Sequence, residues 1–229
     1  MFLHKQAGSG RPNFWTYESP AAGSIVASAP ATTGGTIYPL SPPYMAYNPN
    51  VTYNSSKAMN WSGDWTIELA LINPTTTSGS SNWNGVFQVG SGTSSLVLQL
   101  FSSTSLTLTF RNATQSMATS LAGYPLTWLK IVIMQSGSTT YMYVNGSQVA
   151  SSAFSADPDT LTGSAFILGA APQYWTGKVL GCYDNIRISN IARYTPGGRI
   201  TVPDTLTLDS NCWFYTSFTN TWLPDTGMI

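Results

Sequence analysis

Residues 128–146 read WLKIVIMQSGSTTYMYVNG, and this stretch decides the fold class. Its two runs of β-branched, aromatic and aliphatic residues, 128–133 and 141–144, flank the polar segment 135–138. Such runs, bounded by Gly and Ser, are typical of two strands joined by a turn. The following pair Asn145-Gly146 predicts a two-residue type I′ turn, in which both residues need a positive φ. The stretch therefore predicts consecutive antiparallel strands.

The same pattern continues through the chain from about residue 58 onward. In residues 65–71 (WTIELAL) the large apolar side chains take the odd positions, while Thr66 and Glu68 face the other way. Many short strands joined by turn residues, with no convincing amphipathic helix, predict an all-β, two-sheet antiparallel sandwich. Ile67, Leu108 and Trp128 are expected in its core. Further strands are predicted at residues 85–90, 96–100, 105–110, 165–168, 178–188 and 212–217.

Residues 1–55 differ from the rest because they are dense in Gly, Pro, Ser and Ala. Proline removes backbone donors and fixes φ, so long strands or helices are not expected there. We predict an extended N-terminal arm at residues 1–55 and a sandwich at 56–229. A flexible linker seldom carries many aromatic residues, so these rings should pack either on the sandwich or on a partner. The arm's candidate contact residues are Phe14, Trp15, Tyr17, Tyr38 and Tyr44.

The composition excludes several classes of partner. Charged residues make up only 8% of the chain, and nine basic residues balance nine acidic ones. Nucleic-acid binding through phosphates needs clustered Lys and Arg, which this chain lacks. No apolar run has the length of a signal peptide or a membrane span, so we expect no membrane partner. Cys182 and Cys212 are either free buried thiols or, if two strands bring them together, a disulfide.

Several segments, in order, resemble the laminin-G-like, concanavalin A-like jelly-roll family. Residues 63–68 (GDWTIE) are similar to its first core strand, and residues 128–146 to its central hairpin. Residues 175–179 (WTGKV) and 183–189 (YDNIRIS) resemble its closing strand. The resemblance covers about residues 58–200 and implies a jelly-roll topology. The Pro-rich arm replaces the family's usual first strand, which leaves the N-terminal topology open.

Two segments near the end of the chain resemble a narrower group of domains within this family. Residues 187–195 (RISNIARYT) and 209–215 (DSNCWFY) resemble the endings of such domains in tailed-phage virion proteins. This resemblance implies a structural protein on the exterior of a bacteriophage particle, either capsid decoration or a tail or fibre component. Its partners would be other virion proteins and further copies of the chain.

Catalysis is not expected. The single histidine, His4, makes a histidine-based triad implausible. Glycoside hydrolysis in this fold usually needs two carboxylates across a cleft, and the only glutamates are Glu18 and Glu68. The resemblance implies that Asp184 is structural, and we expect a buried Asp184–Arg187 pair.

We predict no cofactor and no metal. Calcium bound by Asp and Asn oxygens at a sheet rim, with Asp157 and Asp159 as possible ligands, is the alternative. A lectin-like adhesin for host glycans is the alternative function, because exposed aromatic rings stack on sugars. Trp83 and Tyr174, in or beside predicted loops, are its candidate contacts, although a contact between subunits is equally expected for Trp83.

Overall fold

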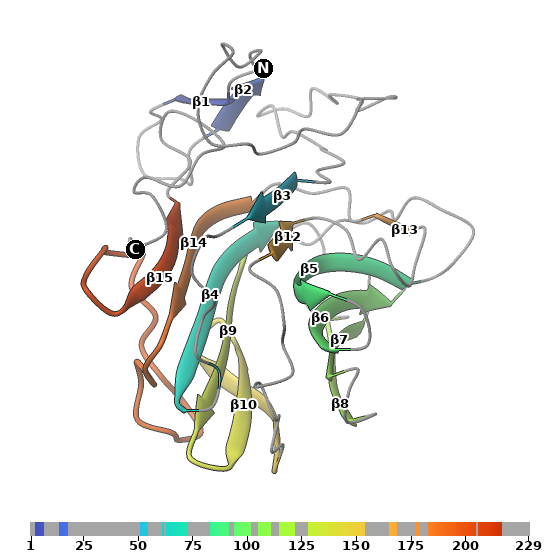
Figure 1. Cartoon of the computed structure of the whole chain (residues 1–229), viewed down its shortest axis with the longest axis vertical. Coiled ribbons are helices and arrows are strands. Elements are labelled where there is room, and N and C mark those ends of the chain that lie inside the picture. The colour runs from blue at the N-terminus through green and yellow to red at the C-terminus, as the bar shows by residue number, and fades with distance from the viewer. Residues whose placement is uncertain are drawn as a thin grey trace.

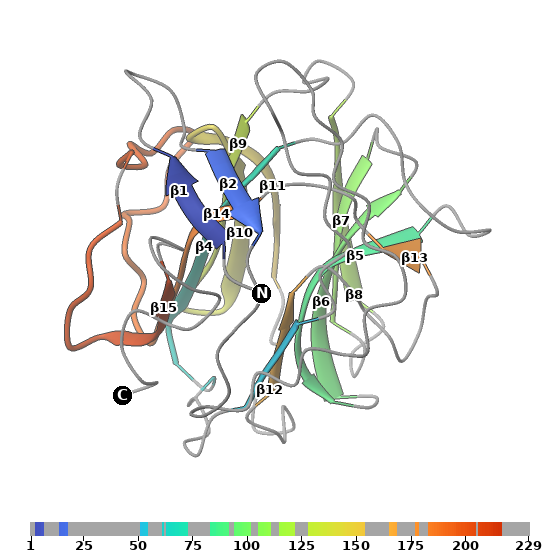
Figure 2. The same cartoon turned by 90° about the horizontal axis from the view of Figure 1, so that it is seen from above.

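The computed structural model describes residues 3–6, 14–17, 51–54, 61, 63–72, 83–91, 94–101, 105–110, 115–121, 128–153, 165–168, 177–178, 183–204 and 206–216. All regular secondary structure in these residues is β. Two sheets lie face to face as separate layers (Figures 1 and 2). The predicted two-sheet antiparallel sandwich is confirmed.

One layer is a six-stranded antiparallel sheet in the order β11-β10-β9-β4-β14-β15. Strand β4 lies between β9 and β14, and its register with β9 runs from Trp65 opposite Gln135 to Ile72 opposite Trp128. The strands are β4 (Trp65–Ile72), β9 (Trp128–Ser136), β10 (Thr139–Val144), β11 (Ser147–Ser152), β14 (Tyr183–Ser189) and β15 (Cys212–Thr216).

The other layer is a seven-stranded sheet in the order β3-β12-β5-β6-β7-β8, with β13 pairing in parallel to β5. Its strands are β3 (Val51–Asn54), β5 (Trp83–Ser91), β6 (Ser94–Phe101), β7 (Ser105–Phe110), β8 (Gln115–Ser120), β12 (Ala165–Leu168) and β13 (Gly177–Lys178). A separate antiparallel hairpin is formed by β1 (Leu3–Gln6) and β2 (Phe14–Tyr17).

The predicted boundary between arm and sandwich differs from the structure in one respect. Strand β3 pairs with β12, so the seven-stranded sheet includes residues 51–54, which the prediction assigned to the arm. Backbone pairing places them there, and the local composition gave no sign of it. Most of residues 1–50 lie outside the described residues, and the arm's extended character stays a prediction.

The core lies between the two sheets and follows the period-2 alternation of the strands. Ile67, Leu69 and Leu71 of β4 pack there, facing Leu96, Leu98 and Leu108 of the other sheet. Ile67 and Leu108 are fully buried, as predicted. Trp128 begins β9, and its side chain lies outside the described residues. At the start of β4, Trp61, Trp65 and Trp213 are all buried, and Trp61 meets the other two edge to face, at 5.4 and 6.4 Å between ring centroids.

The predicted turn at Asn145-Gly146 is confirmed. Their φ values of 51° and 81° are both positive, as a type I′ turn requires. The Asn145 side chain also fixes the neighbouring strand, because its Oδ1 accepts a hydrogen bond from Lys130 N at 2.8 Å. Asn145 N in turn donates to Lys130 O at 2.8 Å. This residue therefore joins the turn to β9.

The outer face of the six-stranded sheet is covered as well. The chain leaves β14 and crosses this face without regular structure before it enters β15. We call residues 190–204 and 206–211 of this crossing the strap. Beneath it lies a second hydrophobic cluster, in which Ile200 of the strap packs with Val132, Met134 and Tyr143 of the sheet. Tyr141, Ala192, Tyr194 and Val202 pack around this cluster.

The strap is joined to the β10–β11 turn through backbone atoms. Ile200 N donates to Gly146 O at 2.7 Å, and Gln148 N donates to Gly198 O at 2.9 Å. The approach is so close that a Cβ on Gly146 would lie 2.4 Å from Ile200 O. Glycine is needed at this position both for the positive φ and for the strap above it.

This close approach is tested by two glycine substitutions. Gly146 and Gly137 both have positive φ, but a Cβ on Gly137 would meet nothing within 4 Å. Gly137→Ala should therefore cost only the left-handed backbone strain of about 1–2 kcal/mol in the free energy of unfolding. Gly146→Ala should cost about 1–3 kcal/mol more, because the strap must move. Urea denaturation measures both, and equal costs would show that the strap does not rest on this turn.

Candidate functional site

The strap covers a buried ion pair at the middle of the six-stranded sheet. Glu68 of β4 lies directly opposite Arg187 of β14, on the face turned away from the main core. Arg187 Nε contacts Glu68 Oε2 at 2.6 Å and Nη2 contacts Oε1 at 2.9 Å, a bidentate arrangement. Only 1% of the Glu68 side chain and 6% of the Arg187 side chain are exposed. Arg187 Nη1 also donates to Thr207 O at 2.8 Å, which ties the pair to the strap.

A tyrosine of the strap completes the cluster. Tyr194 donates its hydroxyl hydrogen to Glu68 Oε1 at 2.5 Å. Burial, and then the nearby Glu68 carboxylate, raise the pKa of Tyr194 well above its usual value, so it stays a donor. Both Glu68 oxygens are therefore engaged by partners of the same chain, and the side chain is closed off from solvent. A carboxylate in this position stabilises the strap and has no open side toward a substrate.

A second ion pair holds the far part of the strap. Arg193 Nη1 and Nη2 reach the two Asp209 oxygens at 2.7 Å each, and Arg193 Nε donates to Ser189 Oγ at 2.6 Å. The Arg193 guanidinium holds the pKa of Asp209 well below its usual range. Beside this pair lies the thiol of Cys212, which is free and has its pKa raised by burial. Cys182 lies outside the described residues.

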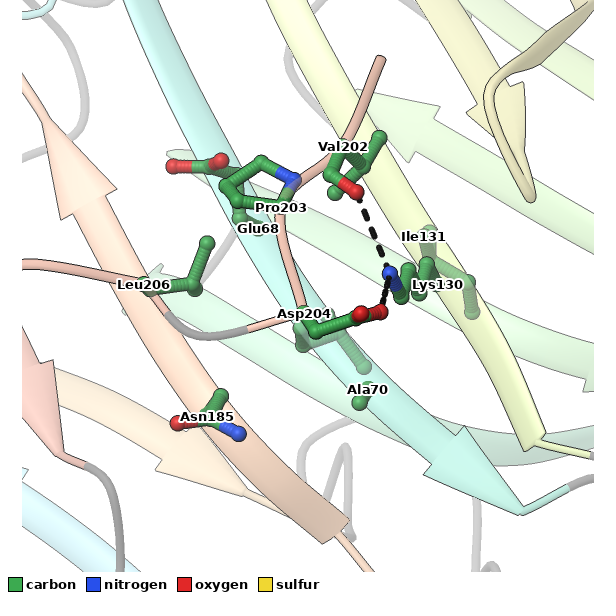
Figure 3. Close-up of a pocket in the computed structure, with 10 residues that line it drawn as sticks. Glu68, Ala70, Lys130, Ile131, Asn185, Val202, Pro203, Asp204 and Leu206 are labelled. Atoms are coloured by element: carbon green, nitrogen blue, oxygen red, sulfur yellow. Dashed lines mark hydrogen bonds and ion pairs between the residues drawn. The ribbon is translucent and has the colours of Figure 1, made fainter. Parts of the chain in front are cut away.

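The one hollow that we describe lies between the strap and the sheet (Figure 3). Lys130 closes one side by donating to Val202 O at 3.1 Å and to Asp204 Oδ1 at 2.5 Å. The volume of the hollow is about 20 Å³, which is room for a single water molecule. A sugar ring does not fit there. The hollow is lined by Glu68, Leu69, Ala70, Lys130, Ile131, Asn185, Val202, Pro203, Asp204 and Leu206.

Arg187 is buried and pairs with Glu68, an acid that the expected Asp184–Arg187 pair did not include; that expected pair stays a prediction. The register of β14 with β4 shifts between Asp184 and Arg187, where Asn185 takes a positive φ of 45°. This β-bulge places Asp184 opposite Ala70 and brings Arg187 opposite Glu68. The Asp184 side chain lies outside the described residues.

The aromatic contact candidates stay untested. Strand β2 contains Phe14, Trp15 and Tyr17. Trp83 is the first residue of β5, where it lies opposite Phe101 of β6, and is not at the tip of a loop. Their side chains lie outside the described residues, as do Tyr38, Tyr44 and Tyr174 altogether.

The described part of the chain contains no group of three or more His, Cys, Asp or Glu residues placed to hold a metal ion. Asp157 and Asp159, the possible calcium ligands, lie outside that part. Among the described residues there is also no helix of the length and apolarity needed to cross a membrane.

Residues 46–195 match the sequence profile of the laminin G family described as the concanavalin A-like lectin/glucanases superfamily. The chain belongs to this family. No curated protein sequence matches this concanavalin A-like chain.

Solved structures similar to this concanavalin A-like chain include domains LG4-5 of the mouse laminin alpha1 chain, with a TM-score of 0.49, 14% identity and 72% of this chain covered. The chain spans 48% of that laminin structure. The CBM40 domain of a Ruminococcus gnavus IT-sialidase, bound to alpha2,3 sialyllactose, has a TM-score of 0.48 and 13% identity, with 66% and 91% of the two chains covered. Tailspike protein 2 of Escherichia coli O157:H7 bacteriophage CAB120 has a TM-score of 0.45 and 17% identity, with 62% and 22% covered.

Local sequence patterns of this concanavalin A-like domain do not reveal the strap or the role of Tyr194. The one available signal was the apolar residues Ile200, Val202 and Leu206, which recur at short spacing after the last predicted family strand. These three line the underside of the strap.

The buried ion pair is tested by removing one or both partners. Arg187→Met leaves the Glu68 carboxylate buried without its cation, and should lower the free energy of unfolding by about 3–5 kcal/mol. The double variant Glu68→Leu/Arg187→Met should recover most of that loss, because no unpaired charge remains. Asp204→Ala, which removes a pair whose acid is 97% exposed, is the control and should leave stability nearly unchanged. An Arg187→Met cost no larger than that of the control would contradict the account.

Proposed function

We propose that this protein is a non-enzymatic structural protein of a bacteriophage particle. It lies on the exterior of the virion, as capsid decoration or as a tail or fibre component. There it binds other virion proteins and further copies of itself.

The observation that carries the proposal is that both carboxylate oxygens of Glu68 are bound by side chains of the same chain. Glucanases and other glycoside hydrolases typically place two carboxylates on either side of a substrate cleft. In this chain Glu68 is buried, forms an ion pair with Arg187 and accepts a hydrogen bond from Tyr194. The hollow that it lines has room for one water molecule. Asp64, also beside the start of β4, accepts a hydrogen bond from Gly137 N at 2.7 Å. Two of the three acids associated with the strands at residues 60–200 are thus engaged within the fold, which favours binding without turnover.

The virion location is supported by the sequence. Residues 187–195 and 209–215 resemble the endings of domains in tailed-phage virion proteins, and they include the two ends of the strap and residues 212–215 of β15. With only 8% charged residues, the surface has little long-range steering to offer. Permanent interfaces depend on packed complementary surfaces more than on charge, which suits such a composition.

A lectin-like adhesin that recognises host glycans is the second candidate. The family to which the chain belongs includes lectins by its description. Sugar recognition in that case would use aromatic rings with neighbouring Asn and Gln side chains, outside the filled space under the strap.

The proposal is tested on purified phage particles. Mass spectrometry should find the chain in particles purified from the phage that encodes it, and antibodies against it should label them intact. An antibody against an internal capsid protein is the control and should label only opened particles. Absence from the particles, or labelling only after opening, would contradict the proposal. Selective binding on a glycan array by a chain that is absent from particles would favour the adhesin.

A further inference from the structure

Strand β8 forms an edge of the seven-stranded sheet (Figure 1). In the described part of the chain its sheet neighbour is β7, and the register runs from Ser105 opposite Ser120 to Phe110 opposite Gln115. Met117 points into the core and is buried, whereas Ser116, Ala118 and Ser120 are exposed on the outer face. The edge therefore presents three small side chains in a row.

Edge strands usually carry features that prevent pairing with another chain, such as charged residues, prolines or bulges. Strand β8 (QSMATS) has no charge and no proline, and residues 112–129 contain no charged residue. Its pairing with β7 shows no register shift. The edge strand β11 of the other sheet differs, because its pairing with β10 shifts between Met142 and Tyr143. Among the described residues, strand β8 is thus an edge without charge, proline or register shift, and the nearest strand of the other sheet is β11.

The sequence of β8 is nearly symmetric about Ala118. Its exposed residues read Ser-Ala-Ser in either direction, and Met117 and Thr119 flank the centre on the inner face. An antiparallel copy centred on Ala118 would place Ala118 opposite itself and Ser116 opposite Ser120. Small side chains permit a close approach there, and no like charges meet. Such self-complementarity is what a two-fold interface requires.

We propose that β8 pairs antiparallel with β8 of a second copy, about a two-fold axis at Ala118. The two seven-stranded sheets then form one continuous sheet. This inference deepens the assembly role proposed above and rests on that role for its biological purpose. Pairing is measured on the purified chain, so its failure leaves the virion location standing. Absence from phage particles would likewise leave the pairing standing.

The register is tested by adding one cysteine at a time to the full chain with Cys182 replaced by serine; the other native thiol, Cys212, is buried. Residues directly opposite in antiparallel strands have Cα atoms about 4.5–5.5 Å apart, within the range of a disulfide. Under mild oxidation Ala118→Cys should give a covalent dimer by itself. Ser116→Cys and Ser120→Cys should each give little alone, and should form a mixed dimer when combined. The parent chain and Ser151→Cys on β11 are the controls and should stay uncrosslinked.

Sedimentation velocity tests the pairing without a crosslink. The parent chain should show a concentration-dependent dimer, and Ala118→Lys should raise its dissociation constant at least about tenfold, because two lysines meet at the axis. Ser151→Lys, an exposed position on β11, should leave the dimer unchanged. A parent chain that stays monomeric, or a dimer unaffected by Ala118→Lys, would overturn the proposal. Crosslinking of Ser151→Cys as efficient as that of Ala118→Cys would also overturn it.

Discussion

The bidentate contact between Glu68 and Arg187 sets the conditions for the rest of the six-stranded sheet. A charge pair buried this completely is stable only if its remaining hydrogen-bonding groups are also satisfied. Thr207 accepts from Arg187, and Tyr194 donates to Glu68; both belong to the strap. The strap must therefore lie across the sheet for the pair to be satisfied. Ile200 and Val202 then add apolar contacts over β9 and β10, which favour the same arrangement.

This arrangement has a consequence for function within the concanavalin A-like family. In the described part of the chain, the strap packs on the outer face of the six-stranded sheet and leaves a hollow of about 20 Å³ beneath it. In many proteins, charged side chains on the surface steer ligands toward a site. In this chain such side chains pair with each other, as in Arg193–Asp209 and Lys130–Asp204. The molecule is suited to contacts through packed, uncharged surfaces and strand edges. Both the proposed virion role and the pairing of β8 use such contacts.

Local sequence patterns predicted those parts of the fold that depend on neighbouring residues. The Asn145-Gly146 turn and the buried faces at Ile67 and Leu108 follow from φ preference and period-2 alternation. The strap could not be predicted in this way, because its irregular backbone has no period and its partners are distant in sequence. Glu68 was assigned to a face opposite the core, but nothing in β4 alone shows that this face is covered.

The partner of Arg187 also could not be predicted from local sequence patterns. The residues of β14 by themselves give no sign of the bulge at Asn185, which brings Arg187 opposite Glu68. The Glu68–Arg187 pair depends on this register, which the sequence of one strand does not show. The contact residues of the arm and of Trp83 depend on side chains beyond the described part, and they remain predictions.

The central claim is that the chain binds without turnover, because its one strand glutamate is committed to the fold. The most direct measurement is reducing-sugar release from a panel of polysaccharides by the purified chain and by Glu68→Gln, with a catalytically active glucanase as the positive control. The account predicts release at the level of buffer alone for both chains. Hydrolysis by the parent chain that is abolished in Glu68→Gln, while that variant stays folded, would contradict it.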